Sequence, residues 1–326
     1  MPDHPGPVGR LQVLAQVLEK TGRGTGAGIA RRYLSGMAEQ PPYRTASMSY
    51  RRSAALAGCR PCACNHKFVH WAVSIFAAET DLMDTSCRTH LQRHYDTMWD
   101  GAFSAAASGN IDCDSHLAAG PDPRRGLTLI ARPGAALQAR FDSLLDRLAG
   151  AEPHQYRYPA ADMHVTILSL VTVADDPAPH LLHLADYHAC ARAALAGIPS
   201  FEIDFHGITM SRGAVLAQGF PRGRALQDLR DRLRTQSSDH GLDASLDQRY
   251  RLITAHATLL RFVAPLQDPR RYAALLASLR HEPLGCMRVD AVELVTNDWY
   301  MSSGSVERVA VLPLHAPTPG AGACVT

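Results

Sequence analysis

From Gly126 onward the chain alternates short apolar strands with amphipathic helices, and this order of elements occurs twice. The pattern predicts strand–helix–strand–helix–strand–strand, followed by helix–strand–helix–strand–strand. The expected strands lie at residues 126–132, 163–173, 201–211, 213–220, 251–263, 287–298 and 305–314, and the expected helices at 135–150, 180–196, 223–241 and 268–280. A repeated order of this kind favours an α+β domain with two pseudo-symmetric lobes.

The rest of the chain differs from this regular region. Residues 1–80 mix Gly, Arg, Ser, Pro and Tyr without a sustained period, so we expect a poorly ordered N-terminal extension. Residues 81–120 are interpreted as a helical brace and linker, with a helix over about 87–107 that packs on the regular domain. That domain then covers 121–316, and residues 317–326 form a flexible tail.

The composition is that of an ordinary globular protein. Hydrophobic residues make up 46% and charged residues 20%, which excludes wholesale disorder, and a net charge of +2 gives no field strong enough to identify a nucleic-acid coat protein or a polybasic membrane binder. The longest apolar run is far shorter than the ~20 residues of a membrane-spanning helix. The first residues lack the basic and apolar regions of a secretory signal, and the eight cysteines have no framework spacing, which suggests reduced thiols. We therefore expect a cytoplasmic protein with no membrane association.

Two near-copies of one tetrapeptide lie in corresponding strands of the two repeats. The first is His164-Val165-Thr166-Ile167, and the second is His256-Ala257-Thr258-Leu259. In a strand the side chains of residues i and i+2 point to the same face, so each His projects together with its Thr while the apolar residues turn into the core. If the two strands face each other, two imidazoles and two hydroxyls meet in one cleft.

Such a set of groups suits phosphate chemistry without a metal. One imidazole can take a proton from the nucleophile, the other can protonate the leaving oxygen, and the hydroxyls can hold non-bridging phosphate oxygens. About one His-x-Thr is expected by chance in a chain with 16 histidines, so the equivalent positions of the two copies carry the inference. The competing interpretation is that each His is bonded within the core and each Thr is an ordinary strand residue.

The paired motif, together with the order of strands and helices over about 124–315, resembles the 2H phosphoesterase superfamily, which includes 2'-5' RNA ligase-like proteins and cyclic nucleotide phosphodiesterases. The resemblance implies antiparallel sheets that line a central cleft, with the helices outside. It implies that His164 and His256 are catalytic and that Thr166 and Thr258 bind the substrate phosphate. It further implies an enzyme that cleaves 2',3'-cyclic phosphates or 2',5' linkages and, as in some members, can join 2',5' ends in reverse. We expect this enzyme to be metal-independent, without a cofactor or an obligate protein partner.

One departure from the family bears on the substrate, a nucleotide or short RNA. Members that act on RNA often carry conspicuous basic residues near the cleft, whereas this chain is nearly neutral. Arg251 and Arg261 flank the second motif and could neutralise a phosphate, and Tyr158, Trp299 and Tyr300 could stack on a base. Solvated arginines and core aromatics are the alternatives at these positions.

Two other functions remain open from the sequence. The first is a non-catalytic nucleotide- or RNA-binding module that uses the same cleft. The second is zinc binding at Cys59, Cys62, Cys64 and His66, with Cys87 and His90 as further ligands. The spacing of this cluster does not match the usual pairs of zinc ligands, so we expect no metal.

Overall fold

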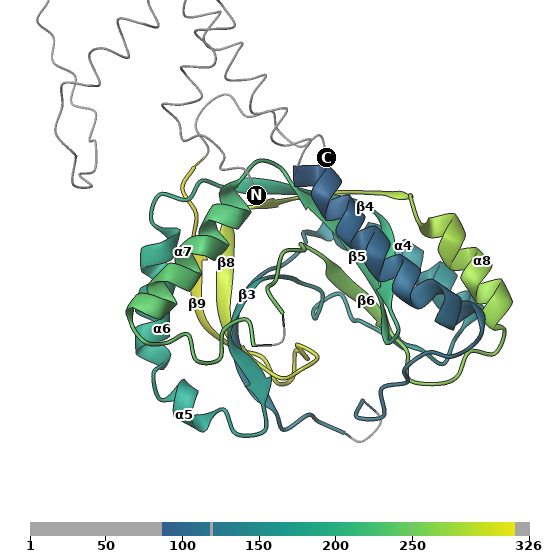
Figure 1. Ribbon diagram of the computed structural model, residues 1–326, viewed down its shortest axis with the longest axis horizontal. Helices are drawn as coiled ribbons and strands as arrows, with labels where there is room; N and C mark the ends of the chain where they lie inside the picture. The colour runs from purple at the N-terminus through teal and green to yellow at the C-terminus, as the bar shows by residue number, and fades with distance from the viewer. Residues whose placement is uncertain (1–86, 118–119, 249, 317–326) are drawn as a thin grey trace, which may run out of the picture. The chain divides into compact units, whose positions relative to one another are not determined.

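The computed structural model describes residues 87–117, 120–248 and 250–316, and these form a curled antiparallel sheet with helices on its outer side (Figure 1). A helix over residues 87–107 comes first, as the sequence predicts. The labelled elements that come after it are β1 (Arg125–Ala131), α4 (Ala135–Ala151), β2 (Tyr156–Arg157), β3 (Val165–Ala174), α5 (Ala178–Leu181), α6 (Leu184–Leu195), β4 (Phe201–Ser211), β5 (Ala214–Pro221), α7 (Ala225–Asp239), β6 (Ala257–Arg261), α8 (Pro269–Leu279), β7 (Pro283–Val289), β8 (Ala291–Asn297) and β9 (Glu307–Pro313).

The strands divide into two lobes that meet at β3 and β6. The order across the sheet is β7-β4-β5-β6-β3-β1-β8-β9, and β2 pairs with β6. All strand pairs are antiparallel, and β3 joins β6 through one residue pair, Val165 with Ala257. The lobe of β3 therefore holds β1, β8 and β9, and the lobe of β6 holds β4, β5 and β7. This confirms the expected two-lobed α+β fold.

The helices cross between the lobes. Helices α6 and α7 pack together and contact β9 and β3, whereas α4 and α8 pack together and contact β7, β4 and β6 (Figure 1). Helix α4 thus follows β1 in the chain but covers the opposite lobe, and α7 follows β5 but covers the lobe of β3. Each lobe combines elements from both ends of the domain, so a lobe does not correspond to one half of the sequence.

Two expected elements are divided in the structure. The single strand predicted over 287–298 is wrong, because the chain crosses from one lobe to the other at Asp290: β7 pairs with β4, and β8 pairs with β1. The helix predicted over 180–196 is interrupted at Leu182 and His183, between α5 and α6. The other predicted strands and helices match elements of the structure within a few residues at most of their ends, although the strand expected over 251–263 is shortened to Ala257–Arg261.

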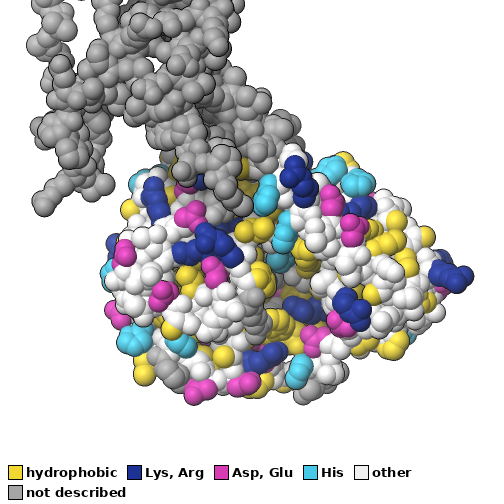
Figure 2. Space-filling model, viewed as in Figure 1, with side chains coloured by type: hydrophobic (Ala, Val, Ile, Leu, Met, Phe, Trp, Pro, Cys, Tyr) yellow, Lys and Arg dark blue, Asp and Glu magenta, His cyan; other side chains and the backbone are white. Residues whose placement is uncertain are grey.

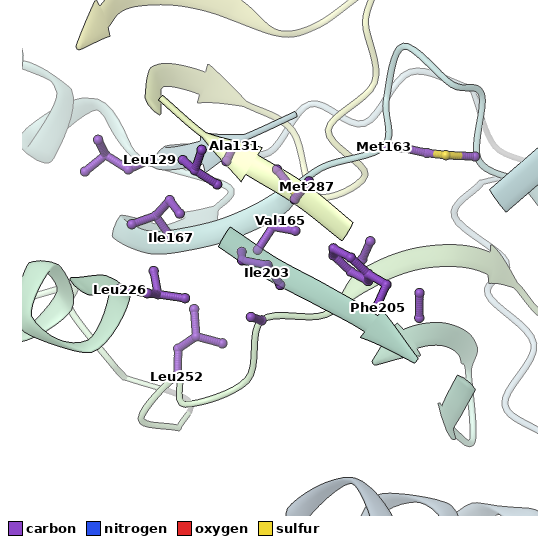
Figure 3. Close-up of a cluster of buried hydrophobic side chains, with 14 of the residues drawn as sticks. Leu129, Ala131, Met163, Val165, Ile167, Ile203, Phe205, Leu226, Leu252 and Met287 are labelled. Atoms are coloured by element: carbon purple, nitrogen blue, oxygen red, sulfur yellow. The ribbon is translucent and has the colours of Figure 1, made fainter. Parts of the chain in front are cut away.

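The apolar residues of both motif strands point into the core. Val165, Ile167, Ala257 and Leu259 are each fully buried, and Figure 3 shows Val165 and Ile167 among apolar side chains from other strands and α7. The alternate side chains of the two motifs, His and Thr, are only half-buried. The core therefore fixes which face of each strand carries the polar pair.

The helix over residues 87–107 packs against β4 and β5 through buried polar contacts as well as apolar ones. The hydroxyl of Tyr95, a fully buried residue, donates to the Gly219 carbonyl (3.0 Å) and accepts from the amides of Gly219 (3.3 Å) and Ala255 (3.2 Å). Thr209 on β4 donates to the Tyr95 carbonyl (2.9 Å). Because Ala255 directly precedes His256, this helix contacts the backbone that leads into the second motif.

The cysteines depart in part from the sequence-based expectation. Cys87, Cys113 and Cys190 are free thiols, but Cys286 is disulfide-bonded, so the thiols are not uniformly reduced. None of the helices in the described ranges is long and apolar enough to cross a bilayer. The expectations for residues 1–80 and 317–326 and for the cysteine cluster at 59–66 lie outside the described residues.

Candidate active site

The four motif side chains line one cavity between the two lobes. Val165 lies opposite Ala257, and extending this antiparallel register by one residue in each direction places His164 opposite Thr258 and Thr166 opposite His256. All four residues line a cavity of about 220 Å³. Figure 2 shows a hollow in the middle of the molecule's face, with histidine and arginine side chains around it. The structure therefore brings together the four residues that the paired motifs single out.

The ring of His164 is oriented by the backbone two residues before it. Its Nδ1 lies 2.7 Å from the Asp162 carbonyl oxygen. A carbonyl can only accept a hydrogen bond, so Nδ1 carries the proton and Nε2 is the nitrogen left for chemistry. The carboxylate of Asp162, a buried residue, accepts from the Ser303 amide (2.8 Å), which ties this turn to the loop after β8.

The ring of His256 is also held at Nδ1, and again by the residue two positions earlier in the sequence. Its Nδ1 lies 2.7 Å from the hydroxyl oxygen of Thr254, which is itself buried. A hydroxyl can donate or accept, so this contact fixes the ring orientation without fixing the tautomer. In both motifs the residue two positions before the histidine thus holds Nδ1. The sequence does not reveal this shared feature, because the group that holds Nδ1 is a backbone carbonyl in the first motif and a side-chain hydroxyl in the second.

The surroundings of both imidazoles disfavour the charged form. Burial lowers the pKa of His164 to about 4 against the opposing effect of the Asp162 carbonyl, with a further contribution from Arg132 and Arg261. Burial also lowers the pKa of His256 to about 4, helped by His164, Arg230, His94 and Arg261. Both rings are therefore neutral at pH 7 in the free protein, and an anion in the cavity would favour their protonation.

One wall of the cavity combines an arginine with aromatic rings. Arg261 donates to the Tyr158 hydroxyl (3.0 Å) and lies over the ring of Trp299, 6.0 Å from its centroid. Tyr158, Arg261 and Trp299 all line the cavity. Arg124 lies over the Trp299 ring as well, at 5.4 Å. The cavity thus combines a guanidinium, which can pair with an anion, with an aromatic surface beside it.

Two residues that the sequence singles out lie elsewhere. Arg251 is exposed and pairs with Asp231 (2.9 Å), and it does not line the cavity. Tyr300, in the loop between β8 and β9, is buried, and its hydroxyl donates to the Asp114 carboxylate (2.9 and 3.0 Å). It therefore connects this loop to Asp114 and does not line the cavity. Its ring also packs under Arg261, 5.3 Å from the guanidinium carbon.

Sequence reasoning missed several polar residues along the cavity. On β3 the half-buried positions are Thr166, Ser169 and Thr172, a spacing of three, because the pairing of β1 with β3 contains register shifts. An alternation of two from Thr166 would instead leave Leu168 and Leu170 half-buried, whereas both are buried. The loop before β6 adds Asp247, Gln248 and Tyr250, and Tyr250 is 65% exposed. Nothing in the periodicity of the sequence shows that this loop lies over β3.

The fold and the cavity define a class of protein in which two strands of a two-lobed antiparallel sheet each present a His and a Thr to one shared site. The sequence profile of the 2'-5' RNA ligase superfamily matches residues 127–299, more than half of the 326 residues. The chain therefore belongs to this superfamily of phosphoesterases and RNA ligase-like enzymes. A search of curated protein sequences finds no match.

Similar folds occur among solved structures. TT0787 of Thermus thermophilus gives a TM-score of 0.44 at 16% identity, over 60% of this chain and 100% of that one. LigT of E. coli, solved in complex with ATP, gives 0.39 at 15% identity, over 59% and 99% of the two chains. Usb1 of Kluyveromyces marxianus gives 0.34 at 13% identity, again over 59% and 99%. These likenesses concern the fold alone.

Proposed function

We propose that this protein is a phosphodiesterase that opens 2',3'-cyclic phosphates or cleaves 2',5' linkages in a nucleotide or short RNA by two-histidine acid–base catalysis. The observation that carries the proposal is the single cavity in which two imidazoles, each held at Nδ1, stand beside two threonine hydroxyls. This arrangement leaves one nitrogen of each ring for proton transfer. The chemistry needs no metal, and the same groups can catalyse 2',5' ligation in reverse by microscopic reversibility.

The hydrogen bonds support distinct roles for the two histidines in hydrolysis. The Asp162 carbonyl raises the pKa of His164 against the effect of burial, because it stabilises the protonated ring, and this suits the general acid. Burial and the surrounding His164, Arg230, His94 and Arg261 lower the pKa of His256 to about 4, the same value as for His164, so the carbonyl at Nδ1 of His164, and not a difference in pKa, distinguishes the two rings. His256 would take the proton of the attacking water, and His164 would protonate the leaving oxygen. The reverse reaction exchanges the two roles.

The remaining cavity residues would bind the substrate. Thr166 and Thr258 present hydroxyls beside the two imidazoles and would donate to non-bridging phosphate oxygens. Arg261 would neutralise part of the phosphate charge, and Trp299 and Tyr158 would contact a base or ribose beside it. The partner of this chain is accordingly a nucleotide or RNA end, and a cytoplasmic location stays a prediction.

The direct test is turnover in the presence of EDTA. Wild type, His164→Ala and His256→Ala are incubated with 2',3'-cyclic AMP and with a short 2',5'-linked oligonucleotide. We expect conversion by wild type and a loss of about 10²-fold or more in both variants, because each removes one proton-transfer group. His154→Ala is the matched control, since His154 is exposed and does not line the cavity.

The alternative, a binding module without turnover, is an outcome of the same experiment. Retention of unconverted cyclic AMP by wild type would support that module. Full activity of both histidine variants would refute the assigned site.

A further inference from the structure

Arg230 on α7 is a buried cation placed directly behind the cavity. Only 1% of the Arg230 surface is exposed to solvent. Its guanidinium donates to four backbone carbonyls, those of Ile167 (2.7 Å), Thr166 (2.9 Å), Thr254 (2.8 Å) and Ile253 (3.1 Å). Two of these carbonyls belong to β3 and two belong to the segment that leads into β6. One side chain thus binds the backbone of both motif strands.

The position of Arg230 coincides with the place where the sheet stops pairing between the lobes. The antiparallel contact between β3 and β6 consists of the pair Val165 and Ala257 alone. Continued pairing would next set Ile167 opposite Ala255, so the carbonyls of residues 166–167 and 253–254 lie just beyond the last pair of the ladder, where the two strands separate. A buried carbonyl without a partner is costly, and the guanidinium satisfies all four.

Two of the four bonds lead directly to the reacting groups. The carbonyl of Thr166 accepts a hydrogen bond from Arg230, and Thr166, a residue of the first motif, also lines the cavity. Thr254 offers its carbonyl to Arg230 and its hydroxyl to Nδ1 of His256. The helix side chain is therefore one hydrogen bond away from the residue that orients His256.

We propose that Arg230 is a positioning residue of this site: it replaces the missing ladder between the two motif strands and sets the separation of His164 and His256. This inference rests on the proposed function. Arg230 is buried and does not line the cavity of the two histidines, so it does not contact a substrate bound there. It acts through the backbone of Thr166 and Thr254. A flat guanidinium with five donors suits such a gap, whereas an ammonium at the end of a flexible chain cannot span four carbonyls at once.

The charge of Arg230 provides a second readout. Burial lowers the pKa of Arg230 to about 10, with Arg234 acting in the same direction and Tyr95, Asp247 and Asp231 opposing it, so the side chain is protonated at neutral pH. Arg230 lowers the pKa of His256 together with His164, His94 and Arg261. The cations that lower the pKa of His164 are instead Arg132 and Arg261. Loss of the Arg230 charge should therefore affect the two imidazoles differently.

The experiment compares Arg230→Lys, which keeps the charge, with Arg230→Met, which removes it. We expect both variants to lose about 10²-fold in kcat on 2',3'-cyclic AMP with a smaller change in KM, because a misplacement on the order of 1 Å has this effect on rate. In NMR titrations the pKa of His256 should rise more in Arg230→Met, which loses the charge, than in Arg230→Lys, and in both variants the pKa of His164 should change less than that of His256. Arg232→Met on the same helix, where Arg232 is exposed and donates to the Ala196 carbonyl, should behave as wild type.

Amide hydrogen exchange reports on the pairing of the strands independently of enzymatic activity. Amide hydrogen exchange over residues 165–168 and 253–257 should speed up in both Arg230 variants but not in Arg232→Met. The proposal would be overturned if folded Arg230→Lys had wild-type kcat and wild-type hydrogen exchange. If Arg230→Met does not fold, the Arg230→Lys variant alone decides the test. If wild type converts no substrate, the phosphodiesterase assignment fails, while exchange and the His256 titration still decide the role of Arg230.

Discussion

The two imidazoles of the cavity should make this protein unusually sensitive to mild acid. His164 and His256 each have a pKa of about 4 in the folded protein, whereas an unfolded histidine has about 6.5. Between these values the unfolded chain binds more protons than the folded one, so the free energy of unfolding falls as the pH falls from about 6.5 to about 4. The stabilising contribution is fully present above about pH 6.5. The perturbation that isolates it is the double variant His164→Gln and His256→Gln.

The expected magnitude follows from the two pKa values. Shifting one histidine from about 6.5 to about 4 reduces the free energy of unfolding by about 2 kcal/mol between pH 7.5 and pH 5. The pair therefore accounts for about 4 kcal/mol, a large share of the total stability of an ordinary domain. Every other titrating group is common to wild type and variant, so the difference between their pH dependences reports these two rings.

Urea unfolding at pH 7.5 and pH 5 measures this difference. Wild type should lose about 4 kcal/mol more than the double variant over that interval, and each single variant should lie between them. The comparison concerns the change with pH, so a general loss of stability in the variants does not affect it. Parallel pH dependences for wild type and double variant would show that the imidazoles are not held neutral in the cavity, and the derivation would be refuted.

Three further predictions concern single side chains. Thr258→Val should lower kcat by about 10²-fold on a cyclic phosphate with little change in unfolding by urea, because in the proposed mechanism it removes one donor to the phosphate. Tyr95→Phe should reduce the free energy of unfolding by about 1–3 kcal/mol, since it leaves buried backbone groups of Gly219 and Ala255 without a partner; unchanged urea unfolding would contradict the hydrogen bonds described above. Gly219→Ala should cost about 3 kcal/mol in the same assay because its Cβ would lie 2.0 Å from the Ala255 carbonyl oxygen, whereas Gly134→Ala, with nothing within 4 Å, should be nearly neutral.

The sequence was informative where local periodicity decides the outcome. The alternation of polar and apolar residues in the two motifs indicates which side chains share a face, and the structure places His164, Thr166, His256 and Thr258 around one cavity. Most helices begin and end close to their predicted limits, and some of these limits are set by local signals, such as Gly197 and Gly241, which have positive φ just after α6 and α7. Asp268, for example, accepts from the Arg271 amide at the start of α8 (3.0 Å).

The sequence could not show features that depend on distant elements. Arg230 occupies a helix position that resembles any other arginine of an amphipathic helix, and its role appears only when α7 lies behind β3 and β6. Tyr95 and Thr254 reach the site for the same reason. Ser169 and Thr172 face the cavity because of register shifts against β1, which no period of two anticipates. The division of the 287–298 segment at Asp290 likewise results from a crossing between lobes.

That crossing affects when the site can exist during synthesis. The lobe that carries His164 needs β8 and β9, the last strands of the domain, and the lobe that carries His256 needs α4, which follows the very first strand. A ribosome releases the chain from its N-terminus, so neither lobe is complete until the last strand of that lobe has emerged, β7 in one case and β9 in the other. Most of the pairings join residues far apart in sequence, and such topologies fold slowly. The complete site with both histidines therefore forms only when translation of the domain is nearly finished, and neither lobe corresponds to a continuous segment that could be excised or grafted.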